Sequence, residues 1–113
     1  MILAPVAATG EDYVTVAVAS NFAATARDIA AQFAEESDYQ VRITAASTGK
    51  LYAQIVNGAP FDVLLAADAA RPLRLESGGQ GVPGSRFTYA LGALVLWSRQ
   101  VDDCRAALQD NDG

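Results

Sequence analysis

Two short polar segments hold the side chains that could bind a small anion, because each follows directly after an apolar, β-rich stretch. The stretches are residues 14–19 and 41–46. The polar side chains are Ser20 and Asn21 after the first, and Ser47 and Thr48 after the second. Hydroxyl and amide groups donate hydrogen bonds, and a helix beginning at each segment adds unpaired backbone N–H groups and the positive end of its dipole. The pattern predicts an oxyanion site that needs no lysine or arginine.

Each half of this site also has a purely structural interpretation. Ser, Thr or Asn at a strand-to-helix turn usually caps the helix that follows. Ser20 or Asn21 is therefore predicted as the N-cap of a helix that runs to Glu36. Two such turns at one edge of a sheet favour a binding site only modestly over two ordinary caps.

Other chemistries find less support in the sequence. Ser47 and Lys50 form an S-x-x-K pattern, which in penicillin-binding enzymes marks a nucleophilic serine, but the Lys-Thr-Gly and Ser-Asp-Asn partners of that pattern are absent. Leu51 follows Lys50 where a phosphate-binding P-loop needs Ser or Thr. The chain contains no histidine, which excludes His-dependent nucleophilic systems within it, and its one cysteine, Cys104, gives no zinc-binding spacing. We expect no enzyme and no metal-cation site.

Two aspartates could be taken for an acid–base pair. Asp62 and Asp68 stand at opposite ends of one predicted strand, about 20 Å apart at the rise of a strand, which is too far for shared catalysis. Asp68 is predicted to cap the following helix, and Asp62 to pair with backbone or contact another domain. The aromatic residues Phe87, Tyr89 and Trp97 are interpreted as core or interdomain packing.

Composition limits the class of protein. The 113 residues are 51% hydrophobic and 19% charged, which excludes a disordered chain or a coiled coil. The formal net charge of −5 argues against nucleic acid as a partner, and the apolar stretches are too short to span a bilayer. The length fits one domain or part of a larger one.

The order of predicted elements is β-α-β-α-β-α. The strands are predicted at 14–19, 41–46 and 61–67, and the helices at 22–36, 50–56 and 69–76. With short connections, this order predicts an α/β fold with a parallel sheet and right-handed crossovers. A turn-rich loop at 78–84, an extended apolar run at 87–97 and a short helical piece at 104–109 follow.

Several motifs then resemble a known family. They are VTVAVASN at 14–21, ASTGKL at 46–51, GAPFDV at 58–63, AAD at 66–68, YALG at 89–92 and LVLWS at 94–98. In this order they are similar to the periplasmic molybdate-binding (ModA) family, the solute-capture components of molybdate ABC importers. The resemblance covers roughly residues 14–98.

The resemblance implies a two-lobed, type II periplasmic-binding fold that closes on tetrahedral molybdate or tungstate, without a cofactor. Carried over by motif, the ligands of the first lobe would be Ser20, Asn21 and Thr48, with Ser47 beside Thr48. A donor-only site would accept the fully deprotonated molybdate or sulfate and disfavour phosphate, which keeps a proton. A periplasmic location and an ABC permease as partner are implied in the same way.

Length departs from the family. We expect an N-terminal extension or signal remnant at 1–13, a first lobe at 14–90, and a hinge crossing with the start of an incomplete second lobe at 91–113. Such a partial chain is expected to bind weakly or not at all, and to self-associate through the apolar face that the second lobe would cover. The alternatives are a lobe for another oxyanion such as sulfate, or a ligand-free fragment that serves only as an interaction or structural piece.

Overall fold

A computed structural model of the chain describes residues 12–100 and 105–106. The predicted N-terminal extension, except for its last two residues, and most of the predicted helical piece at 104–109 lie outside the described residues. The elements are β1 (Asp12–Ala19), a 3-10 turn η1 (Ser20–Phe22), α1 (Ala23–Glu36), β2 (Tyr39–Ala46), α2 (Thr48–Val56), β3 (Val63–Leu65) and α3 (Ala70–Ser77).

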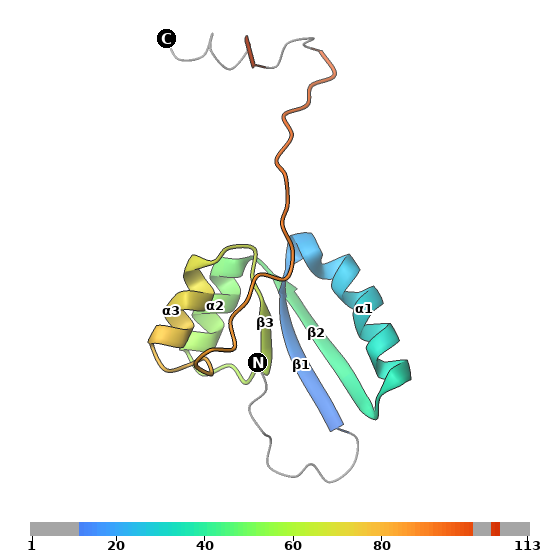
Figure 1. Cartoon of the computed structure of the whole chain (residues 1–113), viewed down its shortest axis with the longest axis vertical. Coiled ribbons are helices and arrows are strands. Elements are labelled where there is room, and N and C mark those ends of the chain that lie inside the picture. The colour runs from blue at the N-terminus through green and yellow to red at the C-terminus, as the bar shows by residue number, and fades with distance from the viewer. Residues whose placement is uncertain (1–11, 101–104, 107–113) are drawn as a thin grey trace.

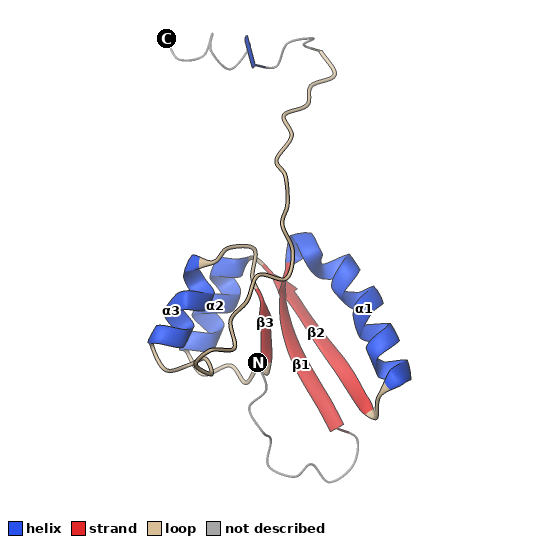
Figure 2. Cartoon of the chain, viewed as in Figure 1, coloured by secondary structure: helices blue, strands red, loops and turns tan. Residues whose placement is uncertain are grey.

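The three strands form a parallel sheet in the order β2-β1-β3, so the first strand lies in the centre. This confirms the predicted α/β class and strand direction. Helix α1 covers one face of the sheet, while α2 and α3 lie together on the other (Figures 1 and 2). The carboxyl ends of all three strands therefore meet at one edge, where the chain turns into helices.

The core lies on both sides of the central strand. Alternate β1 residues point to opposite faces, and Ala17, Val18 and Ala19 are all buried. On the α1 side, Val18 packs with Ala23 and Ala26 of the helix. These small residues allow α1 to lie close to the sheet where β1 ends.

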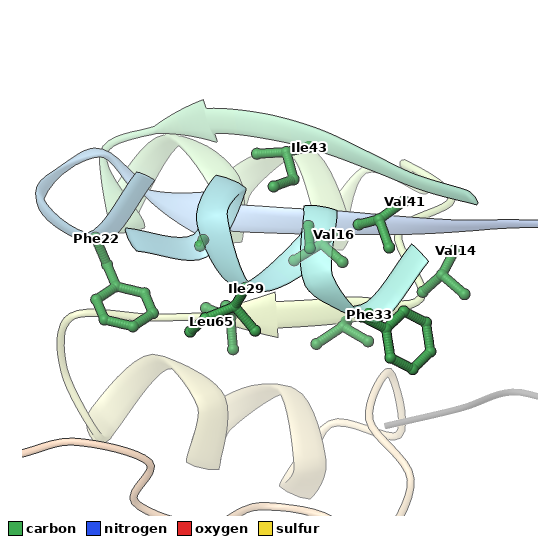
Figure 3. Close-up of a pocket in the computed structure, with 11 residues that line it drawn as sticks. Val14, Val16, Phe22, Ile29, Phe33, Val41, Ile43 and Leu65 are labelled. Atoms are coloured by element: carbon green, nitrogen blue, oxygen red, sulfur yellow. The ribbon is translucent and has the colours of Figure 1, made fainter. Parts of the chain in front are cut away.

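A groove of about 200 Å³ runs between α1 and the sheet. Figure 3 shows side chains from all three strands and from α1 around it. The lining is entirely apolar: Val14, Val16, Phe22, Ala26, Ile29, Ala30, Phe33, Val41, Ile43, Val63 and Leu65. It leaves Ile29 and Phe33 substantially exposed on the helix, so α1 alone does not cover this face of the sheet.

The third strand is shorter than the predicted range 61–67. At its start, Asp62 already bonds to β1 through its N–H and the Thr15 carbonyl, but the chain turns tightly just before, with the Phe61 N–H on the Ala59 carbonyl. At its end, the carbonyl of Ala66 and the N–H of Ala67 are bonded to side chains from outside the sheet. Ala66 and Ala67, the last two residues of the predicted strand, therefore do not pair with β1 through these groups.

Asp62 ties the beginning of β3 to the central strand, as the sequence predicted. Its Oδ2 accepts the backbone N–H and the hydroxyl of Thr15, both at 2.9 Å.

The second helix ends at the Asn57–Gly58 pair, as predicted. Gly58 has a φ of 96°, a left-handed conformation that residues other than glycine rarely adopt.

The apolar run at 87–97 is extended but joins no strand among the described residues. It leaves the body of the protein near the carboxyl edge of the sheet and projects away from it (Figure 1). Phe87 and Trp97 are exposed, so the prediction that they pack in a core is wrong, while the alternative of interdomain packing stays a prediction. The reason is that no described element lies against them.

Candidate oxyanion site

The two predicted binding segments lie side by side at the carboxyl edge of the sheet. Ala19 and Ala46, the last residues of β1 and β2, are direct partners in the ladder, and Val18 pairs with Leu65 of β3. Adjacent strands are about 4.8 Å apart. The residues that follow Ala19 and Ala46 therefore emerge next to each other.

Ser20 and Asn21 do not cap a helix, so that prediction is wrong. They form the 3-10 turn η1, and α1 begins only at Ala23, whose N–H bonds to the Ser20 carbonyl. Neither η1 nor α1 has a side-chain cap. Both side chains are exposed, and none of the hydrogen bonds found among the described residues uses their hydroxyl or amide groups. Their donors remain available to a ligand.

Ser47 behaves differently because it is the N-cap of α2. Its Oγ accepts the N–H of Lys50 at 3.3 Å, a long bond that leaves the hydroxyl proton free to be donated elsewhere. The side chain is exposed. Among the described residues, no hydrogen bond engages the N–H of Thr48 or Gly49, the first two residues of α2. This helix end can therefore offer backbone donors as well as a hydroxyl.

Thr48 is buried, with 8% of its surface exposed. Its Oγ1 accepts the N–H of Ala67 from the loop after β3, at 3.1 Å. A hydroxyl that accepts one bond still has its own proton to donate. Thr48 thus joins the beginning of α2 to the third strand and keeps one donor.

Charge at this edge is balanced locally. Asp68 was predicted as the N-cap of α3, but the N-cap is Ala69, one residue later, and it has no side-chain cap. Asp68 instead accepts the Arg71 N–H at 2.9 Å, and its other oxygen forms an ion pair with the Arg71 guanidinium. The backbone N–H of Arg71 is the main cause that lowers the pKa of Asp68, against a smaller opposing effect of burial. The guanidinium lies about 3.5 Å from where a Cβ on Gly49 would stand, beside the first turn of α2. The negative charge of the Asp68 carboxylate is therefore balanced by the guanidinium of Arg71.

Tyr89 is a residue of this edge that the sequence interpretation assigned only to packing. Its hydroxyl donates to the Ala66 carbonyl at 3.2 Å, and its ring lies 5.0 Å from the ring of Phe22, centroid to centroid. Partial burial raises the pKa of Tyr89. The YALG motif at 89–92 begins with Tyr89 but gives it no role at this edge, because its partners are 23 residues or more away in sequence.

The described residues hold no cluster of His, Cys, Asp and Glu suited to a metal ion. Among them there is also no helix with the length and apolar character to cross a membrane. What the edge collects is a set of neutral donors: the side chains of Ser20, Asn21, Ser47 and Thr48, and the first N–H groups of α2.

Comparison with known proteins agrees with this architecture. The chain is similar to the molybdate-binding protein ModA of Azotobacter vinelandii, with 52% identity over 101 residues, which are 87% of this chain and 40% of that protein. It is also similar to ModA of Rhodobacter capsulatus, with 48% identity over 112 residues, 96% of this chain and 44% of that one. The chain thus spans less than half the length of these relatives.

A solved structure with a similar fold is the periplasmic molybdate-binding protein of Azotobacter vinelandii, with a TM-score of 0.66 and 46% identity. The match covers 67% of this chain and 33% of that one. These relatives confirm the resemblance that the sequence motifs indicated. The family described as bacterial extracellular solute-binding protein matches residues 14–110. The chain belongs to this family of bacterial extracellular solute-binding proteins.

Proposed function

We propose that this chain contributes one lobe of an oxyanion-capture site and that its ligand is molybdate or tungstate. The observation that carries the proposal is the availability of the donors of Ser20, Asn21 and Ser47 at one edge of the sheet. The names of the relatives, molybdate-binding proteins, point to the same ligand.

The site would act by binding alone, with no catalytic step. Hydroxyls, an amide and backbone N–H groups can surround a fully deprotonated tetrahedral oxyanion without offering an acceptor. Phosphate keeps a proton at neutral pH, and burying that proton without a partner costs free energy. The size of the ring of donors would separate molybdate from the smaller sulfate.

In this proposal the lobe belongs to the periplasmic capture component of an ABC importer and delivers its ligand to the membrane permease. The periplasmic location and the permease partner are both inferred from the family, which is described as bacterial extracellular solute-binding protein. Thr48 completes the set with the proton that its bond to Ala67 leaves free. The ion pair of Asp68 and Arg71 limits the repulsion that a carboxylate would exert on an anion nearby.

Isothermal titration of the chain with molybdate, beside sulfate and phosphate, tests the proposal. Because the chain supplies only one lobe of the site, we expect weak but saturable molybdate binding, and no heat from phosphate. Ser20→Ala should weaken molybdate binding by about 1–3 kcal/mol, the range for losing a hydrogen bond to a charged group. Ser77→Ala is the matched control, since Ser77 is exposed at the last turn of α3. Equal affinity of both variants and the unchanged chain would remove Ser20 from the site.

A further inference from the structure

Tyr89 touches two of the three loops at the carboxyl edge of the sheet. Its ring packs against Phe22, the last residue of the turn that contains Ser20 and Asn21. Its hydroxyl bonds to the carbonyl of Ala66, in the loop after β3. The chain reaches this position after passing back over the body of the protein from α3, close to the start of α1 (Figure 1).

The third loop is connected through the next residue. Ala67, directly after Ala66, donates its N–H to the Thr48 hydroxyl at the beginning of α2. The Thr48 hydroxyl has one proton to donate and lone pairs that accept, so a group that donates to its lone pairs also determines where the proton points. Because the Ala67 N–H occupies a lone pair, the proton of Thr48 is left to be donated to a ligand.

We propose that Tyr89 is a positioning residue for oxyanion binding, which holds the Ala66–Ala67 loop so that Ala67 orients the hydroxyl of Thr48 as a donor. The inference rests on the proposed function and gives a role to Tyr89, the first residue of the YALG motif at 89–92, that the motif alone does not indicate. It also explains why a tyrosine stands here and not a phenylalanine: the ring alone would keep the contact with Phe22 but not the bond to Ala66.

The hydroxyl of Tyr89 is suited to this role at neutral pH. Burial raises the pKa of Tyr89, so the group stays protonated and continues to donate. The acceptor is a backbone carbonyl, which does not titrate. The connection from Tyr89 to Thr48 therefore works over the whole neutral range.

Tyr89→Phe tests this inference because it removes the hydroxyl and keeps the ring. The matched control is Tyr39→Phe: Tyr39 stacks on Phe33 at the amino end of β2, at the other end of the sheet from the site. Three measurements are made on each variant in the full chain: molybdate affinity by titration, hydrogen exchange of the Ala67 amide by NMR, and the urea unfolding midpoint.

We expect Tyr89→Phe to weaken molybdate binding about fivefold, the effect of losing one neutral hydrogen bond. It should also speed exchange of the Ala67 amide. Because the Tyr89–Ala66 bond is also present in the ligand-free chain, the unfolding midpoint should fall slightly below that of Tyr39→Phe. A merely structural tyrosine would lower the midpoint in the same way but leave the affinity of the folded protein unchanged.

The failures are distinguishable. If the unchanged chain binds molybdate and Tyr89→Phe binds it equally well, the positioning role is overturned while the proposed function stands. Equal weakening by Tyr89→Phe and Tyr39→Phe would overturn it too, because the effect would not be specific to the site edge. If the unchanged, folded chain gives no heat with molybdate, the proposed function falls and this inference falls with it.

Discussion

The hydroxyl of Thr48 accepts the backbone N–H of Ala67 at 3.1 Å, although 19 residues separate them in the chain. One residue begins α2 and the other follows β3, so this bond fixes the helix N-terminus against the edge of the sheet. Because Thr48 is buried, water does not readily replace the bond if it is lost.

Thr48→Val should therefore destabilise the fold. The substitution keeps the shape and leaves the Ala67 N–H without its acceptor, which costs about 1–3 kcal/mol for a buried donor. Urea unfolding at neutral pH measures the loss. Thr44→Val is the control, since Thr44 is exposed on β2 and valine favours strands. Equal stability of the two variants would show that Ala67 finds another partner.

Asp62→Ala should weaken the attachment of β3 to the sheet. The carboxylate accepts two bonds from Thr15, and its removal leaves the Thr15 N–H unpaired at a half-buried position. We expect a loss of about 1–2 kcal/mol of unfolding free energy. Asp28→Ala, on the exposed side of α1, serves as the comparison. An Asp62 variant as stable as the Asp28 variant contradicts this role.

Stability should depend on pH through Asp68. Its pKa is lowered in the folded chain, chiefly by the Arg71 N–H, so the folded state favours the ionised form. The contribution is complete above the ordinary aspartate pKa of about 4 and is lost as the pH falls through the lower folded value. Asp68→Asn should lower stability at pH 7 by about 0.5 kcal/mol, the scale of an exposed ion pair, and the difference between the two proteins should shrink as the pH falls below about 4. A constant difference from pH 7 to pH 2 would refute the assignment.

The exposed apolar segment 91–97 should make the chain associate with itself at high concentration. Leu91, Leu94 and Val95 are almost fully exposed, next to a body that already carries an open apolar groove. Leu94→Asp should lower the average mass measured by light scattering at millimolar protein. Thr88→Asp adds the same charge at a polar position and should change the mass little. A monomeric unchanged chain would contradict the expectation.

Much of the fold follows from the sequence because apolar periodicity is a local property. The buried run of β1 and the helical spacing from Phe22 to Glu36 predict their elements within a few residues. The short β3 was predicted too long, since its ends are set by Thr15, Thr48 and Tyr89, all distant in the chain.

The sequence predicted which residues form the candidate site, but not which of them cap a helix. The sequence places Ser20 and Ser47 in equivalent turns, yet Ser47 caps a helix and Ser20 does not. The difference is the extra 3-10 turn, which moves the start of α1 past Asn21. Such a shift depends on how α1 packs against the sheet, so it cannot be predicted from any single residue.

The central place of β1 has a consequence for how the protein is made. β1 leaves the ribosome before β2 and β3, so it has neither of its neighbours until both of them have been synthesised. Until then, its apolar residues and both of its hydrogen-bonding edges are exposed in the growing chain and can pair with other chains. Early release of this segment, or slow translation between β1 and β3, would therefore expose the cell to aggregation long before any ligand could bind.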